Sequence, residues 1–391
     1  MMQKSVMRRL LILFLITSLT QTVFSQALTS FNFRDLYNPD AEVMISLQAV
    51  RTPQKIDVYY RIQTSQFPLE KYTITWEKRD SFTQSTGSPL INPDSLSTIK
   101  EKKGIWSFDP PAKPWLLVVK VTNTESQMSF INYKRIEAIY PVSGWIEEGN
   151  ERVTKKYLIT GQNYTIKGSD GKPFYVSYFN EEFPAAYPPF AEQAYKADRF
   201  MFHDSTFHVE SGSSFSLKET GLYLFQKDTN AAEGFAMRGV NKIYPKFSKI
   251  DDLVKPLIFI CTQEEYTALQ NAKGDKAKFD KIILDITRDK ERASNFMRSY
   301  FRRVELANQF FISYKDGWKT DRGMIYLIFG LPDEVSINDG NETWYYKTSK
   351  SRFTFVKSGS VYDPDNHVLI RDKRFMEPWF ATIDLWRKSR Y

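Results

Sequence analysis

Cysteine and histidine are scarce in this 391-residue chain, which has one cysteine and three histidines. Cys261 cannot form an internal disulfide, so hydrophobic cores must hold the fold together. It ends the apolar run 257–261, where an inert buried thiol is more common than a nucleophile. The motifs H-E-x-x-H and G-x-S-x-G and a glycine-rich phosphate loop are missing from the sequence. The common hydrolase and nucleotide-binding sites therefore cannot be built in their usual forms.

The few histidines also argue against a metal site. His203 and His208 lie five residues apart, which in a strand places them on opposite faces. The segment 363–367, Asp-Pro-Asp-Asn-His, has oxygen ligands at alternating positions but lacks the glycine and the distal glutamate of a calcium loop. We expect a turn between two strands there, and we expect neither a metal nor a cofactor.

Long hydrophobic runs are lacking except near the amino terminus. Lys4, Arg8 and Arg9 precede an apolar run at 10–19, and small residues surround position 25. We expect a signal peptide over residues 1–25, cut before Gln26. A retained anchor is the alternative, but the run is shorter than the roughly 20 residues that a spanning helix needs. We therefore expect an exported protein without a transmembrane segment, which is periplasmic, associated with the outer membrane or extracellular.

A strong charge bias is also lacking. Loss of the three basic residues in the signal lowers the formal charge from +8 to +5. No block of five or more like charges is present, so we expect no nucleic-acid partner.

Aromatic residues, in contrast, make up 15 % of the chain, a composition that favours β-sheet faces and binding surfaces. Apolar residues alternate with period two in 26–142, as in 56–62, and predict an immunoglobulin-like β-sandwich. The same alternation continues in 143–247 and predicts a second β-rich domain. Three prolines in 183–190 predict a long loop, whose aromatic residues either cover a sheet edge or hold a ligand or an extended partner chain.

In 248–391 the spacing of apolar residues changes from two to three or four, which predicts an α+β domain. Residues 257–261 resemble a buried strand, and Thr262 with Glu265 has the spacing of a capping box. Apolar residues at intervals of three and four predict a long helix over 289–312.

The segment 316–334 follows that helix and resembles the signature of the GWxTD domain. The matching positions are Gly317, Trp318, Thr320, Asp321, Arg322, Gly323, Gly330, Pro332, Asp333 and Glu334. The resemblance continues into 300–308 and 342–346. It implies an exported protein of the Bacteroidota type, with β domains before the signature and no agreed biochemical role.

The motif has a structural and a functional interpretation. Structurally, Gly317 and Gly323 would allow two tight bends, Thr320 and Asp321 would accept their N–H groups, and Trp318 would fill a helix–sheet junction. The apolar run 324–329 predicts a central strand. Functionally, the acidic residues would then sit about 20 Å apart at the two ends of that strand and could not share one site.

Two functions remain open. The sequence favours a non-catalytic envelope protein that binds a protein partner or a glycan. The alternative is an unfamiliar hydrolase or processing enzyme that uses carboxylates of the motif together with the loop 363–366.

Overall fold

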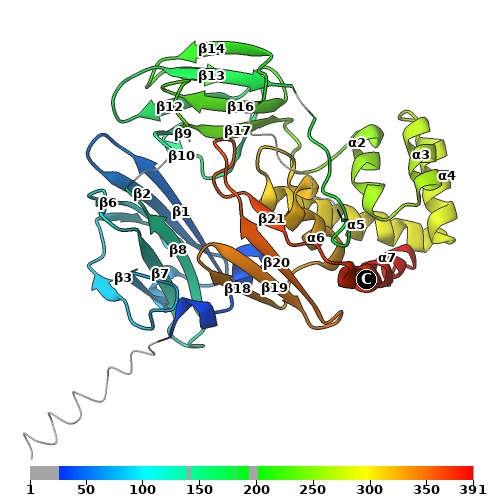
Figure 1. Cartoon of the computed structure of the whole chain (residues 1–391), viewed down its shortest axis with the longest axis horizontal. Helices are drawn as coiled ribbons and strands as arrows, with labels where there is room; N and C mark the ends of the chain where they lie inside the picture. Colours follow the sequence, from blue (N-terminus) through cyan, green and yellow to red (C-terminus); the bar gives the residue numbers. More distant parts are fainter. Residues whose placement is uncertain (1–25, 139–141, 181, 193–200, 391) are drawn as a thin grey trace, which may run out of the picture.

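The computed structural model describes residues 26–138, 142–180, 182–192 and 201–390, arranged as two β-sandwich units and a C-terminal unit of helices and strands (Figure 1). This architecture confirms the predicted fold class. The predicted signal peptide, residues 1–25, lies outside the described residues.

The N-terminal sandwich packs two antiparallel four-stranded sheets face to face. Their strand orders are β1-β2-β6-β5 and β4-β3-β7-β8. Ile56, Val58, Tyr60 and Ile62 are completely buried, because every second side chain of β2 faces the core. The strands are β1 Val43–Arg51, β2 Ile56–Thr64, β3 Tyr72–Arg79, β4 Ser88–Leu90, β5 Ser95–Ser97, β6 Glu101–Phe108, β7 Trp115–Asn123 and β8 Ser129–Ile136, with 3-10 helix η3 at Leu69–Lys71.

Residues before β1 leave the sandwich and pack into the core of the C-terminal unit. They form the 3-10 helices η1 (Leu28–Ser30) and η2 (Arg34–Tyr37). Leu28, Phe33 and Tyr37 are buried in that core, and the Phe33 N–H donates to the Val335 carbonyl (2.8 Å).

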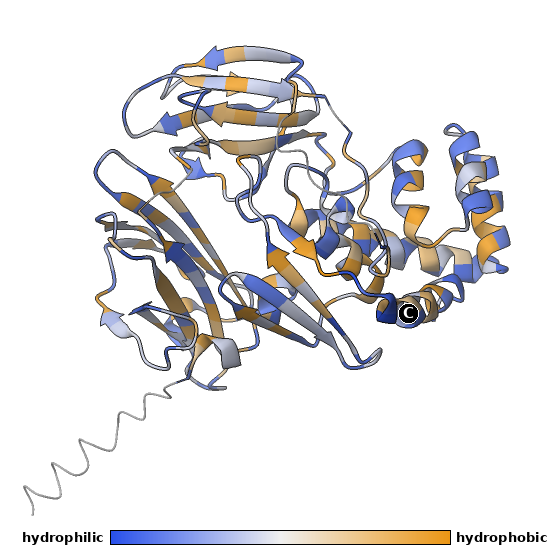
Figure 2. Cartoon of the chain, in the orientation of Figure 1, coloured by the Kyte–Doolittle hydropathy of each residue, from blue (hydrophilic) through white to orange (hydrophobic). Residues whose placement is uncertain are grey.

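The second unit also has two sheets, ordered β10-β9-β12-β15 and β11-β17-β16-β13-β14. Hydrophobic and hydrophilic residues alternate along its strands (Figure 2). All its strand pairs are antiparallel except β11 with β17. The strands are β9 Gly144–Glu148, β10 Glu151–Arg152, β11 Tyr157–Ile159, β12 Asn163–Gly168, β13 Phe174–Phe179, β14 Ser205–Val209, β15 Ser214–Ser216, β16 Gly221–Gln226 and β17 Phe235–Val240.

The C-terminal unit packs helices against an antiparallel sheet ordered β18-β19-β20-β21. Its strands are β18 Glu334–Asn338, β19 Asn341–Tyr346, β20 Ser351–Lys357 and β21 His367–Leu369. Its helices are α2 Ile250–Val254, η4 Lys255–Phe259, α3 Gln263–Asn271, α4 Lys276–Thr287, α5 Lys290–Phe311, η5 Gly317–Lys319, α6 Asp321–Phe329, η6 Lys373–Phe375 and α7 Met376–Arg387. The long helix and the capping box of Thr262 and Glu265 are confirmed.

Two predicted strands are wrong, because both segments are helical. Residues 257–261 belong mostly to η4, and residues 324–329 form most of α6. Every α6 residue from Gly323 to Phe329 is buried, so this helix has no polar face to give a 3.6-residue period.

The proline-containing loop packs against both the second unit and the C-terminal unit, and Phe183 is buried in one cluster with Leu222 and Leu224 of β16. Phe183 packs edge-on against Tyr314, with ring centroids 5.0 Å apart, and Phe190 packs against Phe380 of α7 at 5.3 Å. The Ala186 N–H donates to the carbonyl of Lys319 (2.9 Å), which attaches the loop to the GWxTD-like segment.

Candidate functional site

The two central glycines of the motif permit close contact between helices. A Cβ on Gly317 would lie 2.0 Å from the Ala307 carbonyl oxygen of α5, and one on Gly323 would lie 1.8 Å from the Gly317 oxygen. Neither glycine has the positive φ that a left-handed bend requires. The predicted role in tight bends is therefore wrong, since the backbones of α5, η5 and α6 touch at these positions.

Trp318 is buried, as predicted, but it fills a junction between helices rather than between a helix and a sheet. Its ring packs against Phe259 of η4, with centroids 5.9 Å apart. Its backbone N–H donates to Asn308 Oδ1 of α5 (3.2 Å), and Asn308 Nδ2 donates to the Pro245 carbonyl (3.3 Å). Asn308 thereby joins the motif to the segment before α2.

Thr320 and Asp321 attach the start of α6 to its surroundings. The Thr320 hydroxyl accepts the Gly323 N–H (3.0 Å) and caps the helix. Asp321 accepts the Leu369 N–H (2.8 Å) and pairs with Arg371 (2.6 Å), with both side chains largely buried. This carboxylate therefore holds α6 to β21 and the segment that follows it.

The acidic tail of the motif is separated from Asp321 by α6, which is about 14 Å long. Gly330 ends the helix with a φ of +85°, and Pro332 is buried in the connection to β18. Asp333 accepts the Lys347 N–H (2.8 Å), and Glu334 is exposed. The acidic residues of the motif do not meet in one site.

Arg322 is the motif side chain that reaches a large cavity. Its Nη1 donates to Glu342 Oε1 (2.8 Å), and the Glu342 carboxylate also accepts from the Tyr37 hydroxyl (2.7 Å) and from Trp344 Nε1 (2.9 Å). Burial disfavours both charges, yet their attraction lowers the pKa of Glu342 and raises the pKa of Arg322. Burial and the nearby Glu342 charge raise the pKa of Tyr37 well above its usual value.

His367 lies beside this ion pair and connects two loops. Its Nδ1 is 2.8 Å from the Asp365 carbonyl oxygen, and its Nε2 is 2.7 Å from the Gly340 carbonyl oxygen. Nε2 is also 3.7 Å from Glu342 Oε1. Burial and the Arg322 charge lower the pKa of this imidazole.

The segment 363–367 leads from β20 to β21, which confirms the turn predicted there. Asp363 pairs with Lys156 of the second unit (2.9 Å), and Asp365 pairs with Lys357 (3.0 Å). The Lys134 charge on β8 contributes most to lowering the pKa of Asp365. The acidic side chains of the loop thus interact with lysines from all three units.

The junction cavity is the open pocket where the three units meet, and its volume is about 790 Å³. Ala232 of the second unit, β8 and the C-terminal sheet all line it. One wall carries the rings of Tyr133 and Phe82, whose centroids are 4.9 Å apart. Its charged lining is balanced, with four basic and four acidic residues: Lys134, Arg135, Arg322 and Lys357, and Glu137, Asp339, Glu342 and Asp365.

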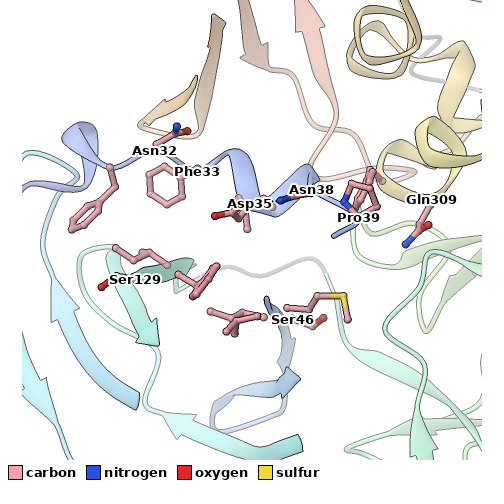
Figure 3. A pocket seen from close by; sticks show the side chains of 16 residues that line it. Asn32, Phe33, Asp35, Asn38, Pro39, Ser46, Ser129 and Gln309 are labelled. Carbon is pink, nitrogen blue, oxygen red and sulfur yellow. Dashed lines mark hydrogen bonds between the residues drawn. The ribbon is translucent and has the colours of Figure 1, made fainter. Parts of the chain in front are cut away.

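A smaller pocket of about 200 Å³ lies between η2 and the strands β1 and β8 (Figure 3). Asp35 is its single charged lining residue, and it accepts a hydrogen bond from Asn38 (3.1 Å). Its volume is below the range of about 300–1,000 Å³ that is usual for ligand sites. The junction cavity is therefore the better candidate.

Sequence reasoning singled out Arg322 and the loop 363–367 but missed Tyr37, Glu342 and Lys134. Glu342 could have been found, because it shares the buried face of β19 with Trp344 and Tyr346, where a carboxylate is unusual. No sequence signal links Tyr37 to Glu342, which lies 305 residues away.

Comparison with known families identifies the C-terminal half. The family model of the GWxTD domain matches residues 221–388, from β16 to α7. This part of the chain is a GWxTD domain. Within this domain, the signature residues connect α5, α6 and the sheet, and Arg322 connects them to the junction cavity.

The other comparisons add little. No curated protein matches the chain. Among solved structures, the titin Ig tandem domains A164–A165 share 10 % identity, with 51 % of this chain and 96 % of that chain covered and a TM-score of 0.18. A Salmonella alpha-2-macroglobulin reacted with methylamine shares 10 % identity, with 52 % and 17 % covered and a TM-score of 0.17. Within the described residues, no helix is long and apolar enough to cross a membrane. The same residues contain no group of three or more His, Cys, Asp or Glu side chains that could hold a metal ion.

Proposed function

We propose that this GWxTD protein is an exported, non-catalytic binding protein of the bacterial envelope, and that a glycan segment binds in its junction cavity. The observation that carries the proposal is the combination of size, charge balance and aromatic wall in that cavity. Its volume of about 790 Å³ lies in the range of small-ligand sites.

The lining chemistry supports an uncharged polar ligand. Arg135 pairs with Glu137 (2.7 Å) and Asp339 (2.6 Å), and Lys357 pairs with Asp365 (3.0 Å), so the cavity offers donors and acceptors without a net charge. Sugar hydroxyls can bond to both, while the ring of Tyr133, supported from behind by the buried ring of Phe82, can pack against the apolar face of a sugar.

A glycan array probed with protein purified from the periplasm of an expressing bacterium tests the proposal, followed by calorimetry on the best ligand. Tyr133→Ala and the rim variant Arg135→Gln should each weaken binding about tenfold, a loss of roughly 1.4 kcal/mol. Tyr175→Ala is the matched control, because Tyr175 is a half-exposed aromatic residue of β13 that does not line the cavity.

The result has four informative outcomes. Binding that is lost in both cavity variants and kept in the control supports the proposal. Equal binding by all three variants refutes the cavity as the site, and recovery of a cleaved glycan by mass spectrometry would replace binding with the alternative function, a hydrolase. Capture of a partner protein that requires Arg135 would identify a protein loop as the ligand instead.

A further inference from the structure

Apolar side chains gather along one edge of the N-terminal sandwich. Ile91, Leu96 and Ile99 are 92 %, 72 % and 75 % exposed, and they are three of the four most exposed large hydrophobic residues in the described part of the chain. Ile105 on the neighbouring strand β6 is also exposed and lies on the same sheet face as Leu96, which pairs with Lys103. Single exposed apolar residues are common, but a cluster of this kind indicates an interaction surface.

The cluster surrounds β5, which is an edge strand with all three residues exposed. The Thr98 N–H donates to the Glu101 carbonyl (2.8 Å), so the backbone groups of Leu96 also face β6 in the alternating antiparallel pattern. Those of Ser95 and Ser97 therefore point away from the sheet. In Figure 1, β1 lies on the side of its sheet that faces the C-terminal unit, and the strand order places β5 beyond β6 at the opposite edge.

We propose that β5 is a self-association site, at which two copies of the chain pair their edge strands antiparallel about a two-fold axis at Leu96. Ser95 of one copy then lies opposite Ser97 of the other, which joins their outward backbone groups in a continuous sheet. Natural sheets protect such edges by keeping them short or by adding charges, proline or bulges. β5 is three residues long and follows Pro93 and Asp94, which limits pairing to this short segment, but the segment itself presents a leucine between two serines.

Charge and area both fit a second copy. In this register Asp94 lies opposite Thr98 of the other copy. Lys100 of that copy follows in the turn to β6, where its ammonium donates to the Ser65 carbonyl (2.9 Å), so each end of the paired strands carries one acidic and one basic residue. Ile91, Leu96, Ile99 and Ile105 together expose on the order of 500 Å² per copy, so pairing that covers all four would bury at most about 1,000 Å² in total, the lower bound for a specific interface. We therefore expect a dimer that forms and dissociates with concentration.

Sedimentation equilibrium of the exported protein over a range up to about 100 µM tests this directly. The wild type should shift from monomer to dimer, and Leu96→Lys should weaken dimerisation at least tenfold. Ser97→Pro should do the same, because it removes an outward N–H without removing a hydrogen bond to β6. Ile258→Lys is the matched control, since Ile258 is an exposed isoleucine of the C-terminal unit.

A monomeric wild type at the highest concentration would overturn the proposal, as would a Leu96→Lys variant that dimerises like the control. Circular dichroism confirms that the variants are folded. The proposal is independent of the glycan site, because β5 does not line the junction cavity.

Discussion

Replacing Glu342 with glutamine removes one charge from a buried ion pair while keeping the shape of the side chain. The carboxylate is 5 % exposed and accepts hydrogen bonds from Tyr37, Arg322 and Trp344 at 2.7–2.9 Å. An amide has one accepting oxygen, so its NH₂ group would face a donor, and the Arg322 charge would lose its partner. Removing one member of a buried pair costs about 3–5 kcal/mol, and we expect a loss of unfolding free energy in that range.

Urea unfolding at pH 7, followed by tryptophan fluorescence, measures this loss. Glu334→Gln is the matched control, because it makes the same substitution at an exposed position of the neighbouring strand β18. We expect the control to stay within about 0.5 kcal/mol of the wild type. If Glu342→Gln came within about 1 kcal/mol of the wild type, the ion pair would not stabilise the fold as argued.

The pH dependence gives a second check. Burial alone would raise the pKa of Glu342, but the attraction of Arg322 outweighs it and lowers the pKa. A lowered folded-state pKa contributes stability above the unfolded value of about 4.3, and this stability is lost as pH falls through the folded value. The difference between wild type and Glu342→Gln should therefore shrink below about pH 4. A difference that stays constant to about pH 3 would contradict the assignment.

Three further outcomes follow from the motif and its neighbours. Trp318→Ala should lower the unfolding free energy by about 3–5 kcal/mol in the same urea assay, because it empties a buried site, and a wild-type midpoint would show that the ring contributes little. Asp321→Asn should cost about 3 kcal/mol, since it breaks the buried pair with Arg371, and a melting temperature equal to that of the wild type would argue against this. Burial lowers the pKa of Lys315 to about 8, so relative to Lys315→Met the wild type should gain up to about 3 kcal/mol of stability between pH 8 and 10.4. If the difference in unfolding free energy between the wild type and Lys315→Met did not change over this interval, burial of the Lys315 charge would not destabilise the fold.

Local sequence patterns determined the elements that have one buried and one exposed face. The alternation at 56–62 predicted β2 because its side chains point in turn to the core and away from it. The intervals of three and four residues predicted α5, which is buried along one face of a 22-residue helix. The sequence also predicted the capping box at Thr262, because both of its hydrogen bonds join residues within one four-residue segment.

Tertiary structure decided the elements and contacts that local patterns do not encode. The run 324–329 became a helix because neighbours bury it on all sides, which removes the polar face that would have marked its period. Gly317 and Gly323 allow the backbones of α5, η5 and α6 to touch. This need for glycine depends on how the helices pack and not on the conformation of either residue. The junction cavity combines Lys134, Glu342 and His367 from distant parts of the chain, and Tyr37 donates to Glu342 from the buried side. The sequence alone thus determined that these residues can carry charge and form hydrogen bonds. Only the packing of the three units brought them together, because burial and proximity depend on segments that are remote along the chain.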